Sequence, residues 1–240
     1  MTLAEPAADL PVIYLIRHGE TRANVERRYE GTGDGDLTER GRRQAQRIAL
    51  LLASSDLRAV YSSPKLRAFR TAEAIAARHR LTPVVMEGLA EVDFGEWEGL
   101  TYEEVQGRDP ERLEGWLADP VHCRPPGGES LADMWRRVRQ CMAEILRVQS
   151  TTTGAPGRRA EVAVVSHGGP IRAILSFSEC GDLSAFWSPT VAPGEVRPVP
   201  GGRLRDVLRC PPRRPGSPHN QWHLCRERPG EKVGRFRSRR

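Results

Sequence analysis

The chain has 240 residues, of which 38% are hydrophobic, and a mean hydropathy of −0.53, which suits one large α/β domain or two small ones with a buried core. Its longest strongly apolar run, residues 12–16, is far shorter than the roughly 20 residues of a membrane-spanning helix. The N-terminal segment carries acids where a signal peptide has a basic region. The five cysteines include no CxxC pair. We therefore expect a cytoplasmic protein with reduced thiols and no membrane partner.

The formal net charge of +6 is concentrated near the C-terminal end of the chain. Residues 188–240 hold 13 basic and 4 acidic side chains, together with 9 prolines and 6 glycines, whereas residues 1–187 carry a net charge of −3. A proline and glycine content this high is typical of disordered or low-complexity chain. We predict a domain over 1–187 and a Pro/Arg-rich tail over 188–240 that is disordered or the product of a frame shift. Because the tail lacks a recognisable nucleic-acid-binding motif, no nucleic-acid partner is expected.

Strand-like and helix-like segments alternate along the chain before this tail. Hydrophobic patterning predicts strands over 12–16, 59–63, 82–87 and 161–165. Helices are predicted over 38–54, 64–78, 129–148 and 170–178, with Thr38 as the N-cap of the first and Ser63 as the N-cap of the second. Residues 88–128 read as loop and short helix. The alternation predicts an α/β fold, a three-layer α/β/α sandwich around a mainly parallel sheet.

Polar clusters follow three of the predicted strands, at 17–21, 62–67 and 166–169. The carboxyl ends of parallel strands form a common crevice, so these clusters are expected to converge there. The clusters bring two arginines and two histidines, with glycines after the second histidine that let backbone amides approach a ligand: Arg17, His18, Arg67, His167, Gly168 and Gly169.

This combination of side chains suits a phosphate dianion. Arginine binds phosphate oxygens through two parallel hydrogen bonds and stays charged, whereas a neutral imidazole is a nucleophile that can accept a phosphoryl group. A metal site is disfavoured, because no HxH or HExxH spacing is present and Arg17 would repel a cation. We therefore expect neither a metal nor a cofactor.

Five segments in this order resemble the histidine phosphatase superfamily, also called the phosphoglycerate-mutase-like family. They cover about residues 12 to 175 and read VIYLIRHGETRANVERRYEGTGDGDLTERGRRQA, YSSPKLRAFRTAEAIA, LAEVDFGEWEGLTYEEV, PGGESLADMWRRV and VAVVSHGGPIRAIL. The resemblance fails after about Leu175, where a family member continues with a helix and the strands that complete the sheet.

The resemblance implies roles for the residues of the polar clusters. His18 would be the nucleophile that forms a phosphohistidine, and Glu91 would be the proton donor to the leaving group. Asp93 is a rival for the role of Glu91, although it also reads as a turn residue before Phe94. The phosphate and substrate contacts are assigned to Arg17, Arg67, His167, Asn24, Thr21 and Gly168.

The branch of the family follows from the segments around the pocket. GEWEGLTYEEV and HGGPIR are more similar to the phosphatase branch than to the mutases, which usually continue the second histidine as HGNS. We therefore expect a metal-independent phosphomonoesterase acting on a small phosphorylated metabolite, with the ribazole phosphate of cobalamin assembly and sugar phosphates as candidates. Mutase-type phosphoryl transfer and non-catalytic phosphate binding remain alternatives. The sequence does not fix the oligomeric state, and a homodimer is one option.

Overall fold

The computed structural model describes residues 10–150 and 160–209. Within this part of the chain, no helix is long and apolar enough to cross a membrane. The elements in chain order are β1 Val12–Arg17, α1 Arg22–Glu26, α2 Glu39–Leu51, β2 Leu57–Ser62, α3 Leu66–His79, β3 Val84–Val85, the 3-10 turns η1 Glu87–Leu89 and η2 Gly95–Trp97, α4 Tyr102–Arg108, α5 Pro110–Ala118, α6 Leu131–Ser150, β4 Glu161–Ser166, α7 Gly168–Cys180, β5 Val196–Pro200 and α8 Gly201–Arg209.

A single five-stranded sheet, in the order β3-β2-β4-β1-β5, forms the middle layer. The first four strands of this order run parallel, and β5 runs antiparallel to its neighbour β1. The register pairs Arg17 with Ser166, and Ser62 with Val165. The three neighbouring strands β2, β4 and β1 therefore end at the same level. The mainly parallel sheet predicted from the alternation is confirmed.

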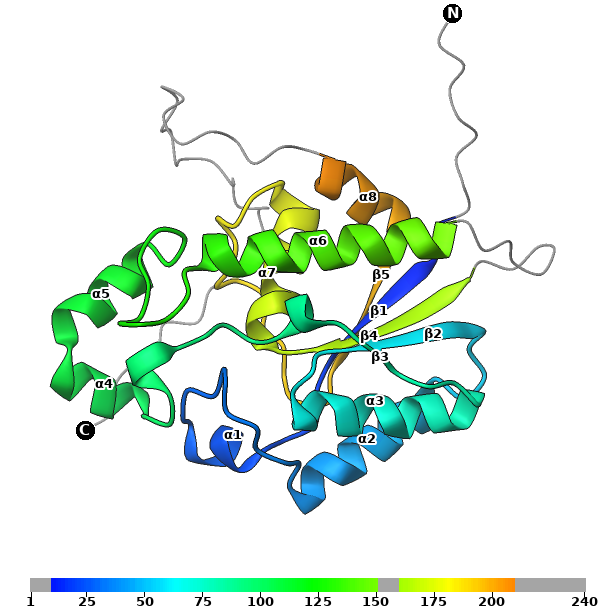
Figure 1. The fold of residues 1–240 in the computed structure, drawn as a ribbon, viewed down its shortest axis with the longest axis horizontal. Helices are drawn as coiled ribbons and strands as arrows, with labels where there is room; N and C mark the ends of the chain where they lie inside the picture. Colours follow the sequence, from blue (N-terminus) through cyan, green and yellow to red (C-terminus); the bar gives the residue numbers. More distant parts are fainter. Residues whose placement is uncertain (1–9, 151–159, 210–240) are drawn as a thin grey trace, which may run out of the picture. The chain divides into compact units, whose positions relative to one another are not determined.

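Helices cover both faces of this sheet (Figure 1). On one face, α6, α7 and α8 pack over alternate residues of β1 and β4, including Leu15 and Val164. On the other face, α2 and α3 pack over the residues in between, including Ile16 and Val165. Alternation of this kind places successive side chains of a strand on opposite faces. The predicted three-layer α/β/α arrangement is therefore confirmed.

Two local predictions differ from the structure. Ser63 is not the N-cap of α3, because that helix begins at Leu66 after an N-cap at Lys65 without a side-chain bond. The strand predicted over 82–87 is reduced to β3, an edge strand of two residues, because the chain turns into η1 at Glu87. In contrast, Thr38 caps α2 as predicted, since its side chain accepts a hydrogen bond from the Gly41 N–H.

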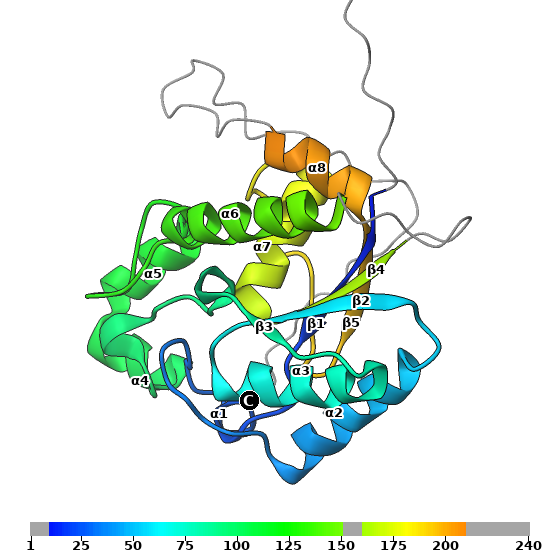
Figure 2. The same ribbon diagram turned by 45° about the vertical axis from the view of Figure 1, so that its right-hand side comes forward.

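The folded part of the chain continues beyond the boundary predicted at residue 187. Strand β5 pairs with Val12–Ile16 of β1, along the edge of β1 opposite β4, and α8 packs against α6 and α7 (Figure 2). The compact unit that contains the sheet extends to Cys210. Prolines are tolerated on an edge strand, where a missing N–H breaks no ladder, so Pro198 and Pro200 do not prevent pairing. The boundary at residue 187 therefore lies too early, and residues 210–240 lie outside the described part of the chain.

Candidate active site

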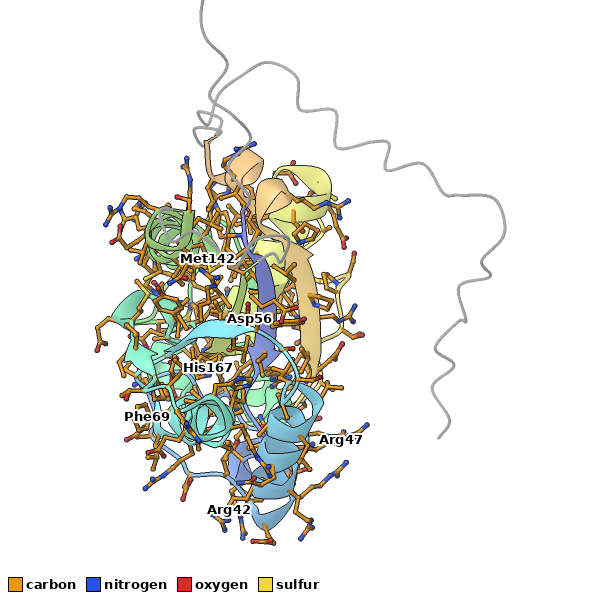
Figure 3. All side chains as sticks on the ribbon, turned by 90° about the vertical axis from the view of Figure 1, so that its right-hand side faces the viewer. Arg42, Arg47, Asp56, Phe69, Met142 and His167 are labelled. Atoms are coloured by element: carbon orange, nitrogen blue, oxygen red, sulfur yellow. The ribbon has the colours of Figure 1, made fainter. Side chains whose placement is uncertain are left out.

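Three polar residues directly follow the three neighbouring strands β1, β4 and β2. His18, His167 and Ser63 come after Arg17, Ser166 and Ser62, respectively, and all three are buried. The rings of His18 and His167 lie with centroids 5.0 Å apart, and His167 Nε2 lies 2.7 Å from Ser63 Oγ. Figure 3 shows His167 on the α3 side of the molecule, away from Met142 on α6. The register of the strands thus brings these residues together, as the sequence predicts.

The imidazole of His18 is held as a neutral base. Its Nδ1 lies 2.7 Å from the carbonyl oxygen of Gly19, which can only accept, so this contact assigns the ring proton to Nδ1. The Nε2 atom is then the unprotonated nitrogen. Burial lowers the pKa of His18 well below its usual value, and the charges of Arg67 and Arg17 lower it further. The ring therefore remains neutral well below pH 6.5, in the form that can act as a nucleophile.

The imidazole of His167 directs a proton toward the same space. The Ser63 oxygen accepts the Lys65 backbone N–H at 3.3 Å, and we assign its hydroxyl as the donor to His167 Nε2, 2.7 Å away. This assignment places the ring proton on His167 Nδ1, which is buried and has no hydrogen-bond partner. Burial lowers the pKa of His167 well below its usual value, and the neighbouring His18 is the second largest cause.

We predict that these two neutral histidines make the fold less stable in mild acid. Between about pH 6.5, the unfolded value, and the lower folded pKa, the unfolded chain binds more protons, so acidification favours unfolding. Stability present above pH 6.5 should fall by up to about 1.4 kcal/mol per pH unit for each histidine. Urea unfolding between pH 7 and 5 measures the slope, with a His18→Asn, His167→Asn double variant as the comparison. Equal slopes in the two proteins would contradict the prediction.

Arg17 is anchored by the segment that leads into β5. Its Nη1 donates to the Val191 carbonyl at 2.6 Å, and the Gly194 N–H bridges the carbonyls of Arg17 and His18 at 3.2 and 3.0 Å. Burial lowers the pKa of Arg17, and the nearby Glu91 carboxylate opposes this effect. Its Nε is buried without a partner. The segment 191–194, which the sequence analysis places in the tail, thus holds Arg17 in position.

Gly194 provides a test of this anchoring segment. Its φ of +77° is in the left-handed region, and an added Cβ would lie 2.9 Å from Gln44 Cβ. Gly194→Ala should therefore lower the free energy of unfolding by about 1–2 kcal/mol. Urea denaturation measures this loss, with Gly202→Ala on α8 as the control, because a Cβ there meets nothing within 4 Å. Equal stabilities of the two variants would contradict the assignment.

Arg67 carries a buried charge beside both histidines and binds the glycine-rich loop, residues 30–36. Its side chain is 1% exposed, and it donates to the carbonyls of Gly33 at 2.6 Å, Glu30 at 3.0 Å and Gly31 at 3.1 Å. The Glu30 carboxylate is 3.8 Å from its Nη1. Arg67, the predicted phosphate ligand, thus also fixes the glycine-rich loop over the start of α3.

Glu91 lies at the N-terminus of α7. Its carboxylate accepts the Gly169 N–H at 3.1 and 3.2 Å and the Val92 N–H at 2.9 Å. A side chain at position 169 would collide with Glu91 Oε1, because an added Cβ would lie 2.3 Å from it. The rival residue Asp93 accepts the Gly95 N–H at 2.8 Å, the contact of a turn residue.

The structure places the predicted substrate-binding residues in two positions. Thr21 and Asn24 form the capping box of α1, in which the side-chain Oδ1 of Asn24 accepts the Thr21 N–H at 3.1 Å. The Thr21 hydroxyl donates to Glu30 at 2.9 Å, so it is already committed to the protein. Gly168 begins α7 against the guanidinium of Arg17, since an added Cβ would be 3.5 Å from Cζ. Gly168 therefore lies beside Arg17, whereas Thr21 and Asn24 stabilise the start of α1.

A pocket of about 300 Å³ opens beside Glu91. Its volume is at the lower end of the range for small-molecule sites. Its walls come from the glycine-rich loop, the start of α3, the segment around Glu91 and the start of α6, and its charged lining residues are Lys65, Glu87, Glu91, Asp93, Glu129 and Arg137. Among the described residues, no group of three or more His, Cys, Asp or Glu side chains could hold a metal ion.

Sequence reasoning did not identify Ser63, Val191 and Arg137 as parts of this arrangement. Ser63 carried a usable signal, because it follows a strand as directly as His18 and His167 do. Val191 acts through its backbone carbonyl, for which the sequence holds no signal. Arg137 resembles the other arginines of a charged helix, and only the packing of α6 against η1 distinguishes it.

Comparison with known proteins agrees with this geometry. Phosphoserine phosphatase 1 of Hydrogenobacter thermophilus is 37% identical over 176 residues, covering 73% of this chain and 80% of its own length. Bifunctional protein Rv2228c of Mycobacterium tuberculosis is 44% identical over 164 residues, which are 68% of this chain but only 43% of that protein. The structure of the alpha-ribazole phosphatase from Shigella flexneri superimposes with a TM-score of 0.69 at 28% identity, covering 78% of this chain and 89% of its own.

The family-level match covers most of the described sheet. Residues 13–203 match the sequence model of the histidine phosphatase superfamily (branch 1), a range that includes β5 and part of α8. The match also extends beyond Leu175, where the resemblance read from the sequence ended. The chain belongs to the histidine phosphatase superfamily.

Proposed function

We propose that the protein is a phosphomonoesterase that hydrolyses a small phosphorylated metabolite through a phosphohistidine at His18. The observation that carries the proposal is the pair of buried, unpartnered polar atoms beside this neutral imidazole, Arg17 Nε and His167 Nδ1. Buried donors without partners are costly, and phosphate oxygens would satisfy both. The named phosphatases among the relatives support the same reaction class.

The first half of the reaction transfers the phosphoryl group to the enzyme. The Nε2 of His18 attacks phosphorus as the bond to the ester oxygen breaks, while the Nδ1–H stays hydrogen-bonded to the Gly19 carbonyl oxygen. Charge on the equatorial oxygens is stabilised by Arg17, Arg67 and the His167 N–H. Glu91, which lines the pocket, gives a proton to the departing oxygen, so the alcohol leaves neutral.

The second half returns the enzyme to its starting state. The Glu91 carboxylate takes a proton from water, whose oxygen attacks phosphorus as the bond to His18 Nε2 breaks. Inorganic phosphate leaves, and both His18 and the protonated Glu91 are restored. The carboxylate can serve both halves because the Gly169 and Val92 N–H groups hold it in one place.

The role of Glu91 predicts a dependence on the leaving group. Glu91→Gln should lower kcat/KM for an alkyl phosphate by about 10²- to 10⁴-fold. Nitrophenyl phosphate, whose phenolate leaves without a proton, should lose less than about tenfold by the same reasoning. Steady-state kinetics on both substrates measures the split, with Asp93→Asn as the control for the neighbouring carboxylate. Equal losses on both substrates would assign the acid to another group.

The substrate class is tested by a panel of phosphorylated metabolites. A pocket of about 300 Å³ favours small leaving groups, so phosphoserine, sugar phosphates and ribazole phosphate belong on the panel. We expect at least one of them to be hydrolysed with a higher kcat/KM than nitrophenyl phosphate. The activity should be unchanged by a chelator, because the proposed chemistry uses arginine and histidine donors throughout. Loss of activity with chelator, restored by a divalent cation, would contradict metal independence.

A further inference from the structure

Arg137, on α6, binds the segment that carries Glu91 with three of its five N–H donors. Its Nη1 donates to the carbonyls of Gly88 at 3.0 Å and Ala90 at 2.7 Å, and its Nη2 donates to the carbonyl of Glu91 at 2.7 Å. The remaining two donors bind Glu129, at 2.9 Å from Nε and 2.7 Å from Nη2. These five hydrogen bonds use all five N–H groups of a guanidinium.

This full set of partners separates Arg137 from the phosphate-binding arginines. Arg17 has an unpartnered Nε directed at no protein acceptor, whereas Arg137 has no donor left for a substrate. Its charge is matched by Glu129 in a two-bond ion pair in which the side chains are 25% and 17% exposed. Arg137 borders the pocket as part of its wall.

The contacts of Arg137 fix the position of Glu91 from the backbone side. Two of its acceptors are the carbonyls on either side of the Glu91 Cα, and the Gly169 N–H fixes the carboxylate from the opposite side. The 3-10 turn η1 lies directly on α6, because an added Cβ at Gly88 would be 2.4 Å from Cys141 Sγ.

We propose that Arg137 and Glu129 form a positioning clamp that aims the Glu91 carboxylate at the leaving-group oxygen. The inference rests on the proposed function and adds a residue pair to it. A misplacement of about 1 Å at a reacting group can cost about 10²-fold in rate. Loss of the clamp therefore acts on proton transfer to the leaving group and spares the attack by His18.

The test compares glycerol 2-phosphate with nitrophenyl phosphate as substrates of the full chain. In Arg137→Met we expect kcat/KM for glycerol 2-phosphate to fall by about 10²-fold, and that for nitrophenyl phosphate to fall by less than about tenfold. Arg137→Lys keeps the charge but cannot reach five acceptors, so it should show the same split. In a Glu91→Gln background, Arg137→Met should no longer change the ratio between the two substrates.

The matched control is Arg136→Met, the next residue on α6, whose side chain is 68% exposed and binds Asp133 at 3.0 Å. This variant should leave the ratio unchanged. Equal losses on both substrates in Arg137→Met, or full activity in Arg137→Lys, would overturn the clamp and indicate a role of the charge alone. If Arg137→Met does not fold, the ratio of kcat/KM values for the two substrates is measured in Arg137→Lys and Glu129→Gln and tests the clamp in the same way. Failure of wild type to hydrolyse either substrate would instead overturn the proposed function.

Discussion

Replacing His18 by asparagine should lower kcat/KM for nitrophenyl phosphate by at least about 10⁴-fold, the scale on which loss of a covalent nucleophile is measured. The reason is geometric. Within His18 the unprotonated nitrogen is Nε2, because Nδ1 donates to the Gly19 carbonyl, and the ring lies 5.0 Å from that of His167. Asparagine has a similar size but no nitrogen lone pair to attack phosphorus. Nitrophenyl phosphate is the right substrate, because its leaving group needs no proton.

The matched control for this variant is His122→Asn. His122 lies on the surface, where its side chain is 67% exposed and its Nδ1 is 2.9 Å from Asp119. This variant should keep the activity of wild type. If His18→Asn retained more than about a hundredth of the activity, attack by water without a covalent intermediate would be the better account.

A chain that ends at residue 187 should lose both its cooperative fold and its activity. The cut removes β5, α8 and the segment before them, and with them three buried apolar side chains, Val191, Val199 and Leu204. Each such side chain contributes about 1.5–3 kcal/mol when fully buried. Together they approach the whole stability of a typical domain, about 5–15 kcal/mol. The cut also leaves the edge of β1 opposite β4 unpaired and removes the Val191 carbonyl that holds Arg17.

The control is a chain that ends at Cys210, where the compact unit ends. It should unfold cooperatively in urea and hydrolyse nitrophenyl phosphate at the wild-type rate. Circular dichroism measures the unfolding of both truncated chains, and steady-state kinetics measures their hydrolysis of nitrophenyl phosphate. A chain of residues 1–187 that is as stable and as active as the longer one would show that β5 and α8 are dispensable.

The sequence could predict the elements whose pattern is local. The buried run at 12–16, the cap at Thr38 and the apolar stripe of the long helix near 131–150 each follow from spacing over a few residues, and the structure confirms them. Strand β5 could not be predicted in this way. Its sequence VRPVP lacks alternation and contains two prolines, and its place in the sheet depends on pairing with β1, which is distant in sequence.

The same distinction between local patterns and long-range packing applies to the candidate site. His18 and His167 could be placed together because each follows a strand, and the register of β1 and β4 brings them level. The clamp at Arg137 could not be predicted, because its five acceptors come from two segments packed against α6. Thr21 and Asn24 stay predicted substrate contacts, and in the structure their bonds to each other and to Glu30 also stabilise the start of α1. Side chains of this type satisfy a helix end as readily as a ligand.

The central claim is that His18 carries the phosphoryl group during turnover, and trapping that group tests it most directly. Wild type is mixed with nitrophenyl phosphate, quenched within a turnover and digested, and the modified peptide is located by mass spectrometry. We predict a phosphoryl group on the peptide containing His18, stable in alkali and lost in acid, and absent from His18→Asn. A phosphoryl group on another residue, or none in a wild-type enzyme that is turning over, would contradict the account.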